Sequence, residues 1–280
     1  MSTTQIGTND LSAAIEPMQF LLRSENDSRY FMKTQKRSTV TILSVRIDNI
    51  SAENAVACIE EMIGGPDQHL IIPVNPEMIM AAQTNIEFRE IINNASLVLP
   101  DGIGVILASH IFRNPISARI PGVDMVQRIA SLAQKRSLRL FLLGAAEGVA
   151  DRTGLMLQKQ YPGLVIAGTY AGSPRPEEEE DICRKINGVQ PHILLVAYGA
   201  PRQELWLGRN LHKLHVSTAM CVGGTFDFIA GEVTRAPRWL QKIGFEWSYR
   251  LMKEPHRWRR MLALPRFAVA VLMNFFRNSA

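Results

Sequence analysis

The chain has 280 residues, 46% of them hydrophobic and 20% charged, which excludes a disordered or fibrous protein and predicts a folded one with a sizeable core. Its three cysteines (Cys58, Cys183 and Cys221) are far apart, which excludes a disulfide framework or a paired-cysteine metal site and predicts free thiols in a reducing compartment. The amino terminus has no basic-then-apolar pattern, and no uncharged apolar run approaches the roughly 20 residues that cross a bilayer, so we expect a cytoplasmic protein.

Residues 1–38 are rich in Ser, Thr, Asn and Gln and show no hydrophobic period, which predicts a disordered extension. From residue 39 to residue 231, segments typical of strands and helices alternate. The expected strands are Thr41–Ile47, His69–Val74, Leu97–Leu99, Leu138–Leu143, Val165–Ala167, Ile193–Ala197 and Thr218–Val222. The expected helices are Ala52–Ile63, Pro76–Ile92, Gly102–Phe112, Val123–Lys135, Ala150–Gln160, Glu177–Ile186 and Gln203–Leu211.

These strands are apolar and lack the alternation of apolar and polar residues that marks a sheet with one solvent-exposed face. Strands of that kind are buried on both sides, which is typical of a parallel sheet covered by helices. The sequence therefore predicts an α/β fold over residues 39–231, with a mostly parallel sheet and helices on both of its faces.

Five of the expected strands are followed by glycine-rich or polar loops. In open parallel sheets, ligands bind beyond the carboxyl ends of the strands, so these loops are expected to meet at one edge. Each has a purely structural alternative, because Asn75 and Asp101 could simply cap helices and the glycines could simply form tight turns. The Gly144 loop does not have the spacing of the dinucleotide fingerprint, although its N–H groups could face a phosphate. The loops are Asn75–Glu77, Pro100–Gly104, Gly144–Gly148, Tyr198–Glu204 and Gly223–Asp227.

The segment 232–280 is strongly basic. It carries ten Lys or Arg against three Glu, a net charge of +7, although the whole chain is only +5. Such asymmetry predicts contact with phosphates, a lipid surface or nucleic acid. Pro265 is expected to end the preceding helix, and the apolar segment Phe267–Phe276 is too short to span a bilayer. The two short segments on either side of Pro265 are therefore expected to lie in the headgroup layer. The alternative is a helix that packs on the domain.

Several of these segments also occur in a known family. Together, in order, they resemble the WecG/TagA/CpsF glycosyltransferases (glycosyltransferase family 26) over about residues 40–265. The resemblance implies a Rossmann-like core with a basic helical carboxyl-terminal appendage that closes over the active site at the membrane. It also implies an inverting enzyme that moves a sugar from a UDP-sugar to a polyprenyl-diphosphate-linked saccharide on the cytoplasmic face. The segments are Asn75–Glu77, Pro100–Gly104, Gly199–Glu204, Gly223–Asp227, Arg235–Pro237 and the motif between Glu246 and Arg257.

The resemblance also assigns roles to individual residues. Asp101 is the implied catalytic base, and the arginines of the appendage, Arg250, Arg257 and Arg260, are expected to act on the leaving group. The remaining site residues are expected to bind the substrate, namely Asn75, Gly144, Gly199, Gln203, Gly223 and Asp227. The chain departs from the family pattern at Pro73, where members of the family often have Thr. The hydroxyl contact that Thr could make to the donor sugar is lost here, so this position bears on the identity of that sugar.

No Asp-x-Asp motif is present, and many transferases use such a pair to hold a metal beside the departing diphosphate. Arginines can neutralise the same charge, since guanidinium groups match phosphate oxygens and stay protonated. We therefore expect catalysis without a metal or other cofactor. Among donors, glucose in exopolysaccharide assembly is the first expectation, followed by N-acetylmannosamine and its uronic acid.

The expected partners are the UDP-sugar, the lipid-linked acceptor, the inner face of a bacterial plasma membrane to which the protein attaches peripherally, and a second copy in a homo-oligomer. A nucleic-acid binding module is the main non-enzymatic alternative, but no helix-turn-helix or RNP-like pattern accompanies the positive charge. A dehydrogenase would need the glycine fingerprint and the acidic residue that follows it, and the chain has neither.

Overall fold

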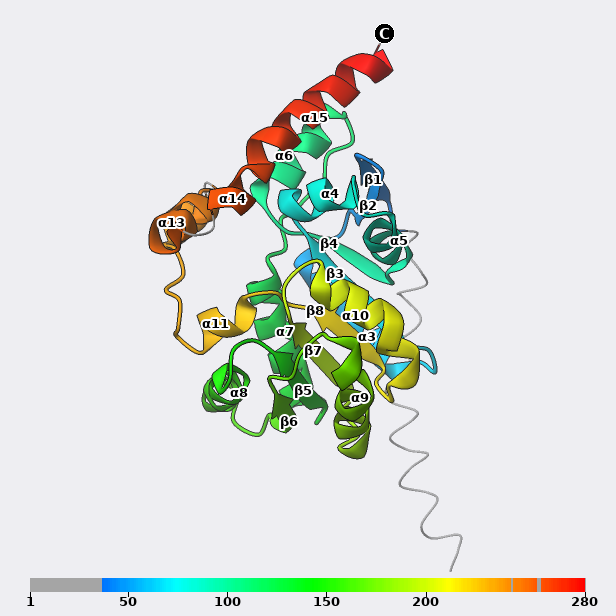
Figure 1. Cartoon of the computed structure of the whole chain (residues 1–280), viewed down its shortest axis with the longest axis vertical. Helices are drawn as coiled ribbons and strands as arrows, with labels where there is room; N and C mark the ends of the chain where they lie inside the picture. Colours follow the sequence, from blue (N-terminus) through cyan, green and yellow to red (C-terminus); the bar gives the residue numbers. More distant parts are fainter. Residues whose placement is uncertain (1–36, 243, 256–257, 280) are drawn as a thin grey trace, which may run out of the picture. The chain divides into compact units, whose positions relative to one another are not determined.

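Six parallel strands form the central sheet, in the order β4-β3-β8-β7-β5-β6 (Figure 1). The computed structural model describes residues 37–242, 244–255 and 258–279, so the expected extension lies almost wholly outside the described residues. Ser38–Ala280 form one compact unit. The strands are β3 (His69–Val74), β4 (Leu97–Pro100), β5 (Arg139–Gly144), β6 (Val165–Tyr170), β7 (Ile193–Ala197) and β8 (Thr218–Cys221).

Helices cover both faces of the sheet, as the apolar strands predicted. In β7, Leu194 and Val196 belong to one buried cluster, and Ile193 and Leu195 belong to another. The first cluster includes residues of α4 (Pro76–Ala82), α5 (Ile86–Asn94), α6 (Ile103–Ile111), α9 (Glu179–Gly188) and α10 (Arg202–Asn210). The second includes residues of α3 (Ala52–Gly64), α7 (Gly122–Lys135), α8 (Val149–Gln160) and α11 (Thr225–Ile229). Two short 3₁₀ turns, η1 (Pro176–Glu178) and η2 (Leu211–Lys213), flank α9 and α10.

Two expected elements were wrong in detail. The single strand Thr41–Ile47 is an antiparallel hairpin of β1 (Thr39–Ile42) and β2 (Val45–Asp48), which turns at two residues with positive φ, Leu43 and Ser44. The helix expected over Pro76–Ile92 is two helices, α4 and α5. Asn85 starts the second one, because its side-chain oxygen accepts a hydrogen bond from the N–H of Phe88 at 3.0 Å.

Among the described residues of the basic segment, four helices follow the sheet. They are α12 (Arg238–Lys242), α13 (Glu246–Lys253), α14 (Trp258–Met261) and α15 (Ala263–Ser279). The boundary expected after residue 231 falls in the irregular connection between α11 and α12. The expected break near Pro265 is confirmed, since α14 ends at Met261 and Pro265 lies in the first turn of α15, where a missing N–H costs no helical hydrogen bond.

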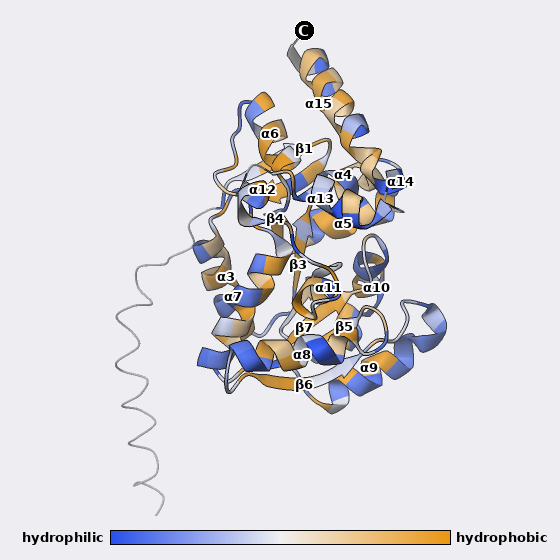
Figure 2. Cartoon of the chain, turned by 90° about the vertical axis from the view of Figure 1, so that its left-hand side faces the viewer, coloured by the Kyte–Doolittle hydropathy of each residue, from blue (hydrophilic) through white to orange (hydrophobic). Residues whose placement is uncertain are grey.

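Helix α15 lies against α4 and α6 (Figure 1). Its contact face buries Phe267 and Val271, which are 4% and 1% exposed. Other apolar side chains remain exposed, and hydrophobic residues run along much of the helix in Figure 2. In the part of the chain that the structure describes, no helix has both the length and the apolar character needed to cross a membrane.

Candidate functional site

A cavity of about 700 Å³ opens at the carboxyl ends of β3, β4, β7 and β8. Four of the five loops predicted to meet at this edge do so, and they contribute Asn75, Asp101, Gly199 and Gly223 to its lining. Residues of α13, α14 and α15 line the same cavity, among them Arg250 and Arg260. The basic segment and the sheet edge therefore form one site.

Gly144 is not among the residues that line this cavity. It has φ +101°, and a Cβ at this position would lie 2.8 Å from the carbonyl carbon of Ala197. Only glycine fits so close to the neighbouring strand in this conformation. Packing of β5 on β7 therefore accounts for Gly144 without a ligand.

Asp101 follows the last residue of β4 and lies beside the end of β3, because its N–H donates to the carbonyl of Val74 at 2.8 Å. Its carboxylate oxygen Oδ2 accepts a hydrogen bond from the N–H of Gly122 at 3.3 Å. Burial raises the pKa of Asp101 to about 6, although the Gly122 N–H and the positive charge of Arg119 act in the opposite direction. At neutral pH this group is an ionised carboxylate that is poised to accept a proton.

Asn75 and Gln203 both line the cavity, and both have structural roles. Asn75 caps α4, with its Oδ1 accepting from the N–H of Met78 at 3.0 Å, so its amide NH₂ is the group available to a ligand. Gln203 is 3% exposed, and its Oε1 accepts from the N–H groups of both Gly199 and Gly223 at 3.1 Å. Its amide therefore joins the loop after β7 to the loop after β8.

The arginines predicted to act on the leaving group differ in their surroundings. The Arg250 guanidinium lies over Gly224, where a Cβ would come within 2.6 Å of Nη2, and over the ring of Phe228 at 4.7 Å. Arg250 also pairs with Glu254 at 3.2 Å. It thus faces the Gly223-Gly224 loop, near the carboxylate of Asp227.

Arg260 instead forms an ion pair with Glu77 of α4 at 2.8 Å. Both residues line the cavity, so the pair joins α14 to the edge of the sheet. Arg257 lies outside the described residues. Of the two described arginines, Arg250 is the one whose guanidinium the structure brings over the glycine loop.

An ion-pair network beside Asp101 was missed by sequence reasoning. Arg235 binds Asp124 of α7 at 2.6 Å and Glu246 of α13 at 3.0 Å, and Arg119 lies 3.7 Å from Glu246. The network ties α13 to the core next to the carboxylate of Asp101. Arg235 and Glu246 stood in the motifs that carried the resemblance, but nothing in the sequence singled out Arg119 or Asp124.

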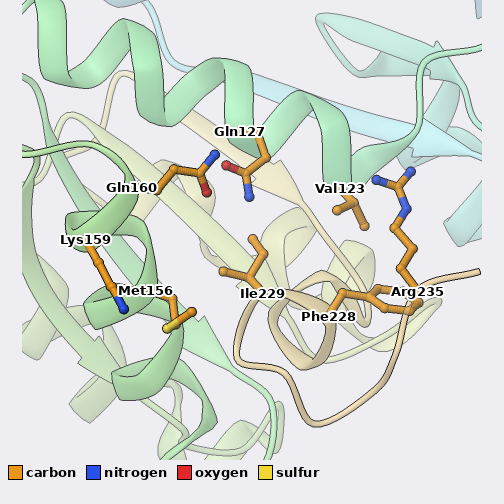
Figure 3. A pocket seen from close by; sticks show the side chains of 8 residues that line it. All are labelled: Val123, Gln127, Met156, Lys159, Gln160, Phe228, Ile229 and Arg235. Carbon is orange, nitrogen blue, oxygen red and sulfur yellow. The ribbon is translucent and has the colours of Figure 1, made fainter. Parts of the chain in front are cut away.

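A second hollow, of about 540 Å³, adjoins the cavity and shares Val123, Phe228 and Arg235 with it. Figure 3 shows that its walls come from α7, α8 and α11, with Gln127, Gln160 and Lys159 among its polar residues. None of the predicted site residues lines it. In the described residues, no group of three or more His, Cys, Asp or Glu is placed to hold a metal ion.

Comparison with known proteins decides the family. A model of the glycosyl transferase WecG/TagA/CpsF family matches residues 40–280. The chain belongs to this family. It is therefore a glycosyltransferase, and the resemblance read from the motifs is confirmed.

Curated relatives of this transferase cover most of its length. A protein of Bacillus spizizenii strain W23 is 35% identical over 202 residues, which are 72% of this chain and 78% of the relative. A protein of Staphylococcus aureus strain MW2 is 31% identical over 241 residues, which are 84% of this chain and 94% of the relative. Both are named N-acetylglucosaminyldiphosphoundecaprenol N-acetyl-beta-D-mannosaminyltransferase.

Proposed function

We propose that this transferase moves N-acetylmannosamine from a UDP-linked donor to N-acetylglucosamine on a polyprenyl diphosphate. The main support for this chemistry is the position of Asp101. Its carboxylate has a pKa of about 6 and lies in a cavity that the basic segment helps to form. The names of the relatives support the choice of donor sugar and acceptor.

The reaction is a single in-line displacement. Asp101 accepts the proton of the acceptor hydroxyl, whose oxygen forms a bond to the anomeric carbon of the donor. The bond between that carbon and the diphosphate oxygen breaks, and UDP departs with the bonding electron pair, so the anomeric configuration inverts. A general base in this role contributes about 10²- to 10⁴-fold to the rate.

Arg250 is proposed to stabilise the departing diphosphate. Its guanidinium lies over the Gly223-Gly224 loop, which follows β8 at the edge where ligands of parallel sheets bind. A fixed cation at the leaving group lowers the barrier because negative charge develops there in the transition state. In this mechanism no metal is needed, and metal independence stays a prediction.

The relatives favour N-acetylmannosamine over glucose, which was the first expectation from the sequence. Pro73 lines the cavity, so the position where family members often carry a Thr hydroxyl presents only an apolar ring. The 2-acetamido group must therefore be recognised by other groups, and the free amide NH₂ of Asn75 is the nearest candidate along the strand.

Peripheral attachment to the inner face of the membrane is part of the proposal, because a lipid-linked acceptor is available only there. Support comes from α15, which exposes Val269, Leu272, Met273 and Phe276 and belongs to the segment 232–280 of charge +7. Apolar residues flanked by cations are typical of helices that lie in the headgroup layer. Homo-oligomer formation stays a prediction.

Product analysis tests the proposal directly. Purified enzyme is given a short-chain polyprenyl-diphosphate N-acetylglucosamine and, in separate reactions, the UDP derivatives of N-acetylmannosamine, its uronic acid, N-acetylglucosamine and glucose. We expect a disaccharide product only with UDP-N-acetylmannosamine, and with inverted anomeric configuration. Efficient transfer of glucose or the uronic acid instead would overturn the assignment of the sugar, and no transfer with any donor would overturn the function.

A further inference from the structure

Glu204 is a buried carboxylate that the proposed mechanism does not use. It is 0% exposed, it lies in the first turn of α10, and burial raises its pKa to about 7. Its Oε1 accepts a hydrogen bond from Nε2 of Gln203 at 2.8 Å, and the thiol of Cys221 lies beside the carboxyl group. A carboxylate in such a place costs stability, since an apolar residue of similar size would avoid the loss of solvation.

The partner of Glu204 holds the two loops of the site together. A single oxygen of Gln203 accepts both the Gly199 N–H and the Gly223 N–H. Gly199 follows β7 and Gly223 follows β8, two neighbouring strands of the sheet, and both glycines line the cavity. The distance between the two loops therefore depends on this amide group.

An amide can occupy the same space in two orientations. If the Gln203 amide were turned by 180°, its NH₂ group would face two N–H donors and both loops would lose their acceptor. An ionised carboxylate only accepts hydrogen bonds, so at pH values above its pKa of about 7 Glu204 admits the orientation in which the amide nitrogen faces it and the amide oxygen faces the loops.

We propose that Glu204 is a positioning residue, which orients the Gln203 amide so that the Gly199 and Gly223 loops are held at the separation required by the donor nucleotide. Glu204 itself touches no substrate. The inference rests on the proposed function, because it takes the nucleotide of a UDP-sugar as the ligand of these loops.

The first test replaces Glu204 by Leu and measures the affinity for UDP by calorimetry, together with the thermal unfolding temperature. We expect the Kd for UDP to rise about tenfold or more, as for loss of a hydrogen bond to a charged group. The unfolding temperature is the control for folding, because removal of the buried charge raises it whereas loss of the acceptor of Gln203 Nε2 lowers it. Thr218→Val is the matched control: it removes another buried oxygen without a hydrogen-bond partner, on β8, and should leave the Kd unchanged.

A double variant shows whether Glu204 acts through Gln203. If it does, Glu204→Leu should add less than twofold to the effect of Gln203→Ala, since the amide to be oriented is already gone. Independent, multiplying effects of the two substitutions would overturn the proposal. So would a Kd within twofold of wild type for Glu204→Leu.

An exchange of the two side chains keeps the proposal testable even if Glu204→Leu does not fold. Gln203→Glu alone places two buried carboxylates side by side and should abolish UDP binding. Adding Glu204→Gln places an amide donor at position 204 against a carboxylate acceptor at position 203. The other oxygen of that carboxylate is still available to both glycine N–H groups. The exchanged protein should therefore regain at least a tenfold tighter Kd than Gln203→Glu alone, and no recovery would overturn the proposal.

The wild-type enzyme separates this inference from the proposed function. If wild type binds UDP and transfers the sugar while the Glu204 variants bind UDP normally, only the positioning role fails. If wild type itself binds no UDP, the proposed function fails and with it the ligand assumed here.

Discussion

Asp101 is subject to two opposing influences. Burial disfavours its charged form, whereas the Gly122 N–H and the Arg119 guanidinium favour it, and the balance raises its pKa to about 6. A base with this pKa is almost fully ionised at pH 7.5 and is still a better proton acceptor than an ordinary aspartate. Its environment thus suits deprotonation of a sugar hydroxyl near neutral pH.

The first prediction concerns catalysis by this residue. Asp101→Asn should lower kcat by about 10²- to 10⁴-fold, because the amide cannot take the proton. In the wild type, kcat/KM should fall below about pH 6 as Asp101 becomes protonated. Steady-state kinetics from pH 5 to 8.5 measure both effects, with circular dichroism as the control for folding. Near wild-type turnover by folded Asp101→Asn would remove Asp101 from the mechanism.

The second prediction concerns stability. Because the pKa of Asp101 is raised from 3.8 to about 6, the folded state keeps a proton that the unfolded state has already released. The free energy of unfolding therefore decreases as pH rises from about 4 to about 6 and is level above that range. Asp101→Asn should thus stabilise the protein at pH 8, by at most about 3 kcal/mol, and have little effect at pH 4.

Urea denaturation at the two pH values measures this difference. Glu204, whose pKa is also raised, contributes a decrease of the same sign in both proteins, so only the difference between variant and wild type is informative. A variant that is less stable than wild type at pH 8 would show that the ionised Asp101 is stabilising in the folded state.

The third prediction concerns Arg250. Arg250→Ala should lower kcat by about 10²-fold, as for removal of one group that stabilises developing negative charge. Arg250→Lys should recover only part of this loss, because an ammonium group cannot bind the diphosphate with two parallel hydrogen bonds. Arg184→Ala is the control, since Arg184 also pairs with a carboxylate four residues away but is 71% exposed on α9. Equal kcat values for Arg250→Ala and wild type would contradict this role.

At the scale of elements, α15 has two faces with different partners. Phe267 and Val271 pack on α4 and α6, whereas Leu272 and Met273 are 45% and 68% exposed. Both alternatives drawn from the sequence, packing on the domain and contact with lipid, therefore fit different sides of the same helix.

The fourth prediction follows from the exposed side. Replacing Met273 and Phe276, which are exposed and do not line the cavity, together by Glu should weaken co-sedimentation with anionic liposomes at least tenfold, because apolar area is lost and charge of the wrong sign is added. Affinity for UDP should not change. Leu155→Glu is the matched control, because Leu155 is also exposed (66%) but lies on α8. Equal liposome binding by the double variant and wild type would contradict membrane contact through α15.

The sequence predicted the buried elements better than the turns. His69–Val74 and Ile193–Ala197 were predicted with the observed bounds, because their side chains are buried on both faces and the apolar run shows this directly. The turn at Leu43-Ser44 was missed because it contains no Gly, Asn or Asp, the residues that usually adopt positive φ, and Ser44 alone is a weak turn signal. The capping role of Asn85 leaves a local signal, but the helical pattern on either side obscured it.

Site residues could be predicted where a local sequence pattern marks their position. Asn75, Asp101, Gly199 and Gly223 each follow a recognisable strand, so their meeting at one edge follows from the parallel sheet. The Arg235–Asp124 pair joins residues 111 positions apart, and no period or spacing in one sequence indicates such a contact. The hydrogen bond that the Gly223 N–H donates to Gln203 was missed for the same reason.

At the scale of the whole molecule, positive charge and the proposed catalytic carboxylate come from different parts of the chain. The basic segment 232–280 supplies Arg250 and Arg260 to a cavity whose proposed base, Asp101, belongs to the sheet edge. The segment is fastened to the core by the ion pairs of Arg235 and by the packing of α15.

The fifth prediction follows from this division. Since guanidinium groups neutralise the leaving diphosphate in the proposed mechanism, sugar transfer should proceed at its full rate in EDTA at a large excess over any contaminating metal ion. The measurement compares initial rates with EDTA alone and with EDTA followed by excess Mg²⁺ or Mn²⁺. Loss of activity that only the added cation reverses would show that a metal takes part.

The position of α15 has a mechanical consequence. The helix rests on α4 and α6, which begin immediately after Asn75 and immediately after Asp101-Gly102. In the proposed mechanism these two helices follow the residues assigned to the sugar and to the acceptor hydroxyl, so a bilayer bound to α15 would act on both. We therefore expect the enzyme to turn over faster on vesicles than with the same acceptor dispersed in detergent.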